Sequence, residues 1–302
     1  MPLIDASQTY QMTNPGAHID ATEVSAVHPN LLDNAYFVGG GSQLGGETFP
    51  INQRGQTSYT SGGTGIDRWC TDLPSGNGVT LTASGVTLDS GVYWGQHRVA
   101  KDLAGETLTL SVMLADGTIY SGTAVYNHEV GVGYTFFGNG LMACYALRLG
   151  SSDVAQFEIS TYTAITVKAV KLEKGTVSTL ANDTIPSFVE ELRKCQRFFC
   201  SSFPLTIAPE AGNTAEWYAS MGTARNNGCY SVWFPVEMYS VPTVIKLGMA
   251  YVFAALPDGT ENTTYDTSIS ATNVTTKGFS MKNSFFNGFA TFGMTWYASC
   301  EP

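Results

Sequence analysis

Side chains that could do acid–base or metal chemistry are present in the sequence but form no recognisable set. The four histidines are far apart, and no two have the spacing that a metal site favours; they are His18, His28, His97 and His128. Sugar hydrolysis would need two carboxylates at a defined separation. The acidic residues of the last hundred positions instead fall in predicted turns and strand ends; they are Glu210, Glu216, Glu237, Asp258, Glu261 and Asp266. With no nucleophile motif either, we expect no catalytic residue, no metal and no cofactor.

Aromatic side chains are the better candidates for a binding site. The apolar faces of sugar rings stack on flat aromatic rings, while sugar hydroxyls need polar partners. Strand alternation turns Tyr218, Trp233 and Tyr297 away from the predicted core, and Tyr265 lies in the polar loop 256–266. These four residues are our candidates for glycan binding. For Trp233 and Tyr297 the alternative is burial between protomers, because a large exposed apolar side chain usually marks an interface.

The motif Ile-Asp-Arg-Trp at 66–69 has two interpretations. Asp67, Arg68 and Trp69 together could stack on a sugar or a base. The simpler interpretation, which we favour, is a buried Trp69 beside an Asp–Arg pair at a domain edge. The glycine-rich stretch 38–46 precedes no amphipathic helix, so we predict a turn there and no phosphate site.

The elements that must position these residues are strands. Strict alternation predicts half-buried strands at 79–84 and 107–114; their inward residues are Val79, Leu81 and Ala83, and Leu108, Leu110, Val112 and Leu114. In 163–175 the apolar face changes phase between Ala169 and Val170, which predicts a β-bulge or a strand end. Turn clusters separate these segments, so we predict antiparallel strands in a jelly-roll-like sandwich over residues 30–175.

A second set of alternating segments follows residue 200. One face of 229–238 is apolar; its residues are Tyr230, Val232, Phe234, Val236 and Met238. One face of the last strand is apolar as well; its residues are Ala290, Phe292, Met294, Trp296 and Ala298, and those opposite are Thr291, Thr295 and Tyr297. We therefore predict a second sandwich over 203–302, and an all-β fold of two sandwich domains.

The segment 186–199 differs from the rest because it is rich in charge. Ser187 and Glu190 have the spacing of a capping box. An apolar stripe follows at helical spacing, which predicts an amphipathic helix of about three turns within the linker 176–202; its members are Phe188, Leu192, Cys195 and Phe199. This stripe could dock on the protein's own chain or pack against copies of itself on a symmetry axis.

Composition and charge exclude several classes of function. The 302-residue chain has a net charge of −10 and no basic stripe, so we expect no nucleic-acid binding. No apolar run approaches the length of a bilayer span, and the first 16 residues lack the features of a secretion signal, so we expect no membrane insertion. The six cysteines are widely spaced, which predicts free thiols and folding in a reducing cytoplasm.

Five segments in this order resemble tail-fibre-type proteins of bacteriophages and prophages: "NLLDNAYFVGGGS", "FPINQRGQTSY", "IDRW", "VKLEKG" and "EELRKCQRFF". In that family a carbohydrate-module-like jelly roll precedes an "EL-x-x-CQR-aromatic" segment and a β-sandwich tip. The resemblance implies a homotrimeric virion protein that attaches the phage to a host-cell polysaccharide. It also favours a trimer contact for the linker helix. Val38 stands where several related modules have a calcium-binding glutamate, which puts calcium in doubt here.

The domain organisation that follows has four parts. Residues 1–29 are an arm that gains order by docking on another virion protein or by making trimer contacts. Residues 30–175 and 203–302 are the two sandwiches, with the linker 176–202 between them, and the last hundred residues form the adhesive tip. The alternative is a purely structural virion component, in a baseplate, neck or head decoration, that contacts only other phage proteins.

Overall fold

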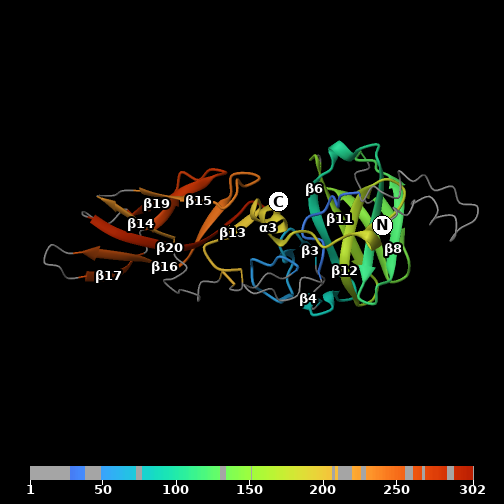
Figure 1. Ribbon diagram of the computed structural model, residues 1–302, viewed down its shortest axis with the longest axis horizontal. Helices are drawn as coiled ribbons and strands as arrows, with labels where there is room; N and C mark the ends of the chain where they lie inside the picture. Colours follow the sequence, from blue (N-terminus) through green and yellow to red (C-terminus); the bar gives the residue numbers. More distant parts are fainter. Residues whose placement is uncertain are drawn as a thin grey trace, which may run out of the picture.

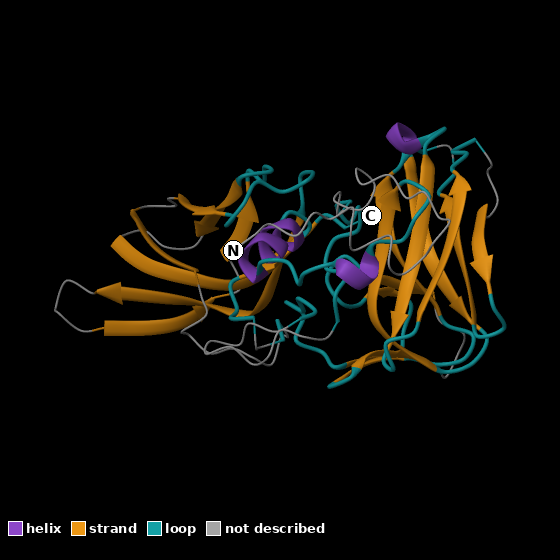
Figure 2. Cartoon of the chain, turned by 45° about the vertical axis from the view of Figure 1, so that its right-hand side comes forward, coloured by secondary structure: helices purple, strands orange, loops and turns teal. Residues whose placement is uncertain are grey.

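The computed structural model describes residues 28–37, 49–72, 77–129, 134–150, 152–205, 208–209, 220–225, 229–255, 261–266, 269–283 and 289–301. These residues are mostly antiparallel strands, which confirms the all-β prediction. Their helices are α3 (Phe188–Gln196) and two short 3-10 turns, Lys101–Leu103 and Leu180–Asn182. Two β modules lie end to end, with α3 and the end of the chain between them (Figures 1 and 2). We call residues 28–183 the first module and residues 199–301 the second module.

The first module consists of two six-stranded antiparallel sheets around one core. One sheet has, in spatial order, β1 (Ser58–Tyr59), β4 (Val79–Thr82), β5 (Gly85–Leu88), β12 (Ile165–Lys174), β7 (Thr107–Leu114) and β8 (Ile119–Val125). The other has β2 (Gly63–Thr64), β3 (Cys70–Asp72), β6 (Tyr93–Val99), β11 (Val154–Thr161), β10 (Met142–Arg148) and β9 (Tyr134–Gly138). Their inward faces supply the core, in which Trp69 stacks on Trp94 with 4.1 Å between ring centroids.

Strand β7 has the predicted bounds and the predicted inward face, but it is not half-buried. Its opposite face is covered as well, because the chain after β12 crosses over it. The Thr109 hydroxyl donates to the carbonyl oxygen of Gly175 (2.9 Å), and the Ser111 hydroxyl donates to the side-chain hydroxyl of Ser178 (2.8 Å). Thr109 and Ser111 are therefore both buried. Polar residues that find partners in a covering segment can occupy such positions.

Two further strand predictions have different outcomes. The phase change in 163–175 is a β-bulge, as predicted, because the register of β12 against β7 shifts between Val167 and Ala169. The strand predicted at 79–84 is too long at its C-terminal end. Strand β4 stops at Thr82, whose hydroxyl bonds to the carbonyl of Gly85 across a tight turn (2.9 Å), so Ala83 is exposed instead of buried.

The second module has two smaller sheets around a separate core. The larger has β13 (Phe199–Ser201), β20 (Phe289–Ser299), β16 (Thr243–Ala255) and β17 (Glu261–Asp266), with β14 (Ser220–Arg225) also paired to β20. The smaller has β15 (Cys229–Trp233), β19 (Gly278–Asn283) and β18 (Ile269–Thr272). Because β13 belongs to this sheet, the second module begins inside the predicted linker. The first half of that linker packs on the first module, where Asp183 pairs with the buried Lys171 (2.5 Å).

The alternation predicted for the second core is largely correct. The confirmed core residues are Val232, Phe234, Met238, Met294, Trp296 and Ala298. Tyr230 is exposed because the first three residues of β15 lie outside the core. Thr295, predicted to face outward, is buried because its hydroxyl donates to the carbonyl of Leu247 on β16.

Helix α3 packs against its own chain. Cys195 and Phe199 are buried, and Phe188 and Leu192 are half-buried. The prediction of a capping box is wrong, because the Ser187 side chain makes no capping bond; Ser187 is the N-cap through its backbone oxygen, which accepts the first helical bond from the Glu191 amide (3.0 Å). No helix in the described part of the chain is long and apolar enough to span a membrane.

Candidate functional site

The two modules meet at a junction in which Asn34 is the central polar residue. The Asn34 side chain is fully buried. Its amide nitrogen donates to the carbonyls of Ile51 (2.8 Å) and Asp67 (2.9 Å), and its oxygen accepts the Ile51 amide (2.7 Å). The Asn34 backbone amide donates to the Glu191 carboxylate of α3 (2.8 Å). One side chain thus joins three segments of the first module, and its backbone fixes the helix to them.

A buried ion-pair network crosses the junction. Asp67 has no exposed side-chain surface and pairs with Arg54 (2.8 Å). Arg54 also pairs with Glu301, near the end of the chain. Burial, together with the nearby charge of Glu301, raises the pKa of Asp67 to about 6, although Arg54 acts in the opposite direction. The protonation of Asp67, in the first module, therefore depends on the charge of Glu301, in the second module.

The favoured interpretation of the 66–69 motif is confirmed with one correction. Trp69 is buried, and its indole nitrogen donates to the carbonyl of Asn34 (2.9 Å). Asp67 pairs with Arg54 instead of its neighbour Arg68, whose guanidinium faces Asp33 (3.3 Å). None of the three residues presents a surface on which a sugar could stack, because all three are buried.

Two consecutive aromatic residues connect the modules. The Arg68 guanidinium lies 3.5 Å from the centre of the Phe198 ring, and Tyr239 stacks on the same residue with 5.2 Å between centroids. Phe199 repeats this arrangement with Arg54 (4.0 Å) and Tyr297 (5.6 Å). Each phenylalanine therefore contacts an arginine of the first module and a tyrosine of the second. Phe198 lies in the turn that follows α3 and Phe199 begins β13, and a different pocket adjoins each stack.

The Tyr297 pocket adjoins the Phe199 stack. It is open to solvent and has a volume of about 540 Å³. Its wall combines the rings of Phe199 and Tyr297 with several hydroxyl and amide side chains; the polar lining residues are Arg54, Gln56, Thr64, Thr243, Ser299 and Glu301. Arg54 and Glu301 pair with each other, so the accessible chemistry is an aromatic face surrounded by hydrogen-bonding groups.

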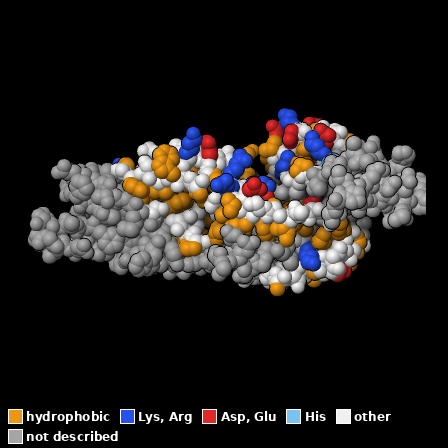
Figure 3. All heavy atoms as spheres, in the orientation of Figure 1, with side chains coloured by type: hydrophobic (Ala, Val, Ile, Leu, Met, Phe, Trp, Pro, Cys, Tyr) orange, Lys and Arg blue, Asp and Glu red, His pale blue; other side chains and the backbone are white. Residues whose placement is uncertain are grey.

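The Tyr239 pocket adjoins the Phe198 stack and has a volume of about 460 Å³. Tyr239 and Phe198 form its aromatic part. Its charged lining residues are Arg68, Arg98, Lys194, Arg197, Asp33 and Asp102. Lys and Arg side chains gather over the middle of the molecule on the face shown in Figure 3, where α3 lies in Figure 1.

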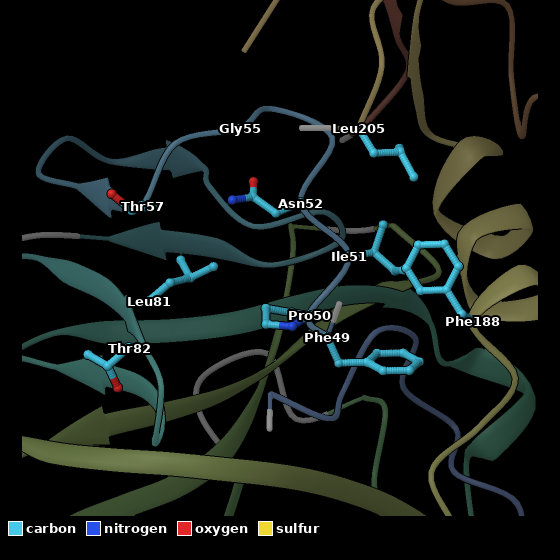
Figure 4. Close-up of a pocket in the computed structure, with 10 residues that line it drawn as sticks. All are labelled: Phe49, Pro50, Ile51, Asn52, Gly55, Thr57, Leu81, Thr82, Phe188 and Leu205. Carbon is cyan, nitrogen blue, oxygen red and sulfur yellow. The ribbon is translucent and has the colours of Figure 1, made fainter. Parts of the chain in front are cut away.

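A third pocket, the Phe188 pocket, lies between α3 and the loop before β1 (Figure 4). Phe188 and Phe49 close one side of it, and Leu81 and Thr82 close the other. Its volume is about 320 Å³, and none of its lining side chains can titrate. Acid–base chemistry in this pocket is therefore excluded.

Two of the predicted glycan residues, Trp233 and Tyr297, do not share a site. Trp233 faces outward as predicted, with 73% of its surface exposed. Tyr297 is half-buried against Phe199. Since their strand neighbours Val232 and Trp296 enter the same core from different sheets, Trp233 and Tyr297 lie on opposite faces of the second module. Tyr265 lies in strand β17, paired with β16, instead of the predicted loop; its side chain and that of Tyr218 lie outside the described residues.

Phe198 and Tyr239, which the sequence analysis did not select, line a pocket at the junction. The signal that could have identified Phe198 is the pair of adjacent aromatic residues at the point where α3 has ended and β13 begins. No comparable signal exists for Tyr239, because the turn that brings it to Phe198 has no repeating pattern.

The buried carboxyl group of Glu158 is engaged in structural contacts. Glu158 has its pKa raised by burial and, to a lesser extent, by the charge of Asp72. A glycosidase needs a carboxyl group with a raised pKa beside a second acid. Glu158, however, accepts hydrogen bonds from Tyr145 and Gln156 and is almost completely buried. It is walled off from any substrate.

The cysteines and histidines also have structural environments. All six cysteines lie in the described part of the chain, and none forms a disulfide. Burial raises the pKa of Cys70 and of Cys200 to about 12, so both thiols stay protonated and poorly reactive. His128 is buried and bonded to Tyr126 (3.0 Å), and His97 contacts Gln156 (2.8 Å). No cluster of three metal-binding side chains exists among the described residues.

Comparison with known proteins adds no relative: no family model, curated protein or solved structure matches this chain.

Proposed function

We propose that this chain is a non-catalytic receptor-binding protein of a bacteriophage tail fibre, which attaches to a glycan on the host cell surface. In this proposal the first module is a jelly roll of the carbohydrate-module type and the second is the adhesive tip. The ordered tail-fibre-like segments support the assignment, and the all-β architecture is compatible with it.

The observation that carries the proposal is the Tyr297 pocket. It places the half-buried ring of Tyr297, which stacks on the buried Phe199, beside threonine, serine and glutamine side chains in an open hollow. A sugar needs an aromatic face for its C–H surface and polar partners for its hydroxyls. Both are available at Tyr297 without any pair of accessible acids, so the pocket suits binding better than hydrolysis.

Homotrimer formation is part of the proposal. Trp233, Tyr230 and Val241 are exposed on the second module, and apolar surface of this kind is suited to protein contact. A trimer would multiply weak sugar sites by avidity. Light scattering on the purified chain at micromolar concentration should give three times the mass of the chain, and a monomer mass would contradict this part.

The second candidate function is a structural virion component. The same exposed apolar residues favour it, because they would also suit burial against other phage proteins. In either case the protein acts in the virion, and residues 1–27, which lie outside the described residues, would dock on a neighbouring virion protein.

The test is retention of the full chain on a panel of immobilised bacterial surface polysaccharides, with reducing ends assayed in the same samples. Retention without new reducing ends supports the adhesin. Release of reducing ends would indicate a glycosidase, and failure to bind any polysaccharide would favour the structural component.

A further inference from the structure

We propose that the Tyr239 pocket binds the carboxylate of an acidic sugar, so that the receptor glycan contains uronic or sialic acid units. This inference rests on the proposed function and adds a second glycan contact, of stated ligand chemistry, to the one at the Tyr297 pocket. The occupant we infer has one negative charge and one apolar ring face, a combination that the pocket matches on separate walls.

The charge of the pocket is opposite to that of the protein. The whole chain carries −10, yet the charged side chains lining this pocket are four basic ones against two acidic ones. Of the acidic pair, Asp33 already faces Arg68, and of the basic set, Lys194 pairs with Glu191. A net positive hollow on an acidic protein concentrates anions from solution.

Two arginines in the pocket retain unused donors. Neither Arg98 nor Arg197 forms an ion pair within the described residues. One Nη of Arg98 donates to the carbonyl of Leu31, which fixes the side chain, while its Nε is buried and has no hydrogen-bond partner among the residues described. Arg98 is partly exposed and Arg197 is exposed, so a ligand in the pocket would meet the outer part of each guanidinium group and not this buried Nε. Carboxylate oxygens match a guanidinium group in both charge and geometry.

Tyr239 and Phe198 supply the apolar contact. Tyr239 is half exposed and stacks on Phe198, which is itself held by the Arg68 guanidinium. The Tyr239 amide also donates to the carbonyl of Arg197 (2.7 Å), so the ring and the cation are connected through the backbone. The aromatic wall is thus fixed before a ligand arrives, which lowers the entropic cost of binding.

The probes are glucuronate, galacturonate and N-acetylneuraminate, each compared with its carboxyl-reduced, neutral counterpart. Ligand-observed NMR with the full chain should show that at least one acid binds about tenfold or more tightly than its neutral counterpart, because a charge-assisted bidentate contact is lost on reduction. The inference is wrong if no acid binds better than the corresponding neutral sugar.

Variants locate the site. Arg98→Gln combined with Arg197→Gln should abolish the preference for the acid, and Tyr239→Ala should weaken acid and neutral sugar alike. The matched control is Lys174→Gln, which removes one positive charge from an exposed pair with Glu106 elsewhere on the first module and should leave binding unchanged. Circular dichroism must show that each variant is folded. Should Arg98→Gln alone unfold the protein, Arg197→Gln alone should still reduce the preference several-fold.

The outcomes separate this inference from the proposed function. Retention on neutral polysaccharides that is insensitive to both arginine variants would refute the acidic-sugar site and leave the adhesin intact. Failure to bind any polysaccharide, acidic or neutral, would refute both. Inorganic phosphate that competes as strongly as the acidic sugar, with no dependence on Tyr239, would indicate a simple anion site and would also overturn the inference.

Discussion

At the scale of single residues, the junction depends on groups that are buried and fully engaged. The Asp67 carboxylate accepts hydrogen bonds from the Arg54 guanidinium and from the Gln53 backbone amide (3.0 Å), and its side chain has no exposed surface. Even so, burial keeps the pKa of Asp67 raised, at about 6. The folded protein therefore binds a proton between about pH 4 and 6 that the unfolded chain does not hold.

This pKa shift predicts that the difference in stability between the wild type and Asp67→Asn depends on pH. A raised carboxyl pKa contributes stability that is present at low pH and is lost as the pH rises through 6. The free energy of unfolding of the wild type, relative to Asp67→Asn, should be about 2 kcal/mol larger at pH 4.5 than at pH 7. Urea unfolding at the two pH values measures it. A difference that is constant, or larger at pH 7, would show that Asp67 titrates normally.

Residue positions that depend on strand alternation could be predicted from the sequence. Trp233 faces outward and Trp296 faces the core for this reason. The partner of Asp67 could not be predicted, because Arg54 reaches it through a turn and a third partner, Glu301, comes from the far end of the chain. Pairings of this kind depend on tertiary approach and leave no periodic signal.

At the scale of elements, the approach of neighbouring strands depends on particular glycines. Gly95 of β6 lies opposite Glu158 of β11. A Cβ atom at Gly95 would lie 2.5 Å from the carbonyl oxygen of Phe157 and 2.9 Å from the Cα of Glu158. Both are backbone atoms, so the strands would have to move apart. Gly138 of β9, in the same sheet, would meet only the Ala143 Cβ, at 3.8 Å, and the Met142 oxygen, at 3.9 Å.

Gly95→Ala should therefore destabilise the first module, whereas Gly138→Ala should not. We expect the first substitution to lower the free energy of unfolding by about 1–3 kcal/mol, the usual cost of overpacking. The second should change it by less than about 0.5 kcal/mol, as most surface substitutions do. Thermal unfolding of both variants beside the wild type provides the measurement. Equal stability of the two variants would contradict the close approach of β6 and β11.

Strands and helices with a strong apolar periodicity could be predicted from the sequence. The segments that pack against them could not. The bounds of β7 and the bulge in β12 follow from patterns of apolar residues. The burial of the outer face of β7 depends on where the segment after Gly175 runs, which no local pattern specifies. For α3, the sequence indicated a helix and its stripe, but it did not show that the backbone of the Asn34 loop would approach Glu191.

At the scale of the whole molecule, the two modules are coupled through the end of the chain. Glu301 belongs to the second module, yet its carboxylate pairs with Arg54 and accepts the Arg68 amide (3.0 Å). Both contacts are largely buried. Removing one partner of a buried pair typically costs 3–5 kcal/mol, so this contact is strong enough to couple the unfolding of the modules.

Glu301→Gln should separate the unfolding of the two modules. Differential scanning calorimetry should show one transition for the wild type and two for the variant. Glu129→Gln, which breaks an exposed pair with Arg148, is the control and should behave like the wild type, because surface pairs contribute little. A single, unshifted transition for Glu301→Gln would mean that the aromatic stacks alone couple the modules.

The central claim is that the Tyr297 ring contacts a glycan in the Tyr297 pocket. Its most direct test is the dissociation constant of an oligosaccharide from whichever surface polysaccharide retains the protein, measured for the wild type, Tyr297→Phe and Tyr297→Ala. The control is Tyr162→Ala, an exposed tyrosine of the first module. A hot-spot contact is worth about 1–3 kcal/mol, so Tyr297→Ala should weaken binding by about 5- to 150-fold, while Tyr297→Phe and Tyr162→Ala stay near the wild-type value. Unchanged binding by folded Tyr297→Ala would contradict the claim.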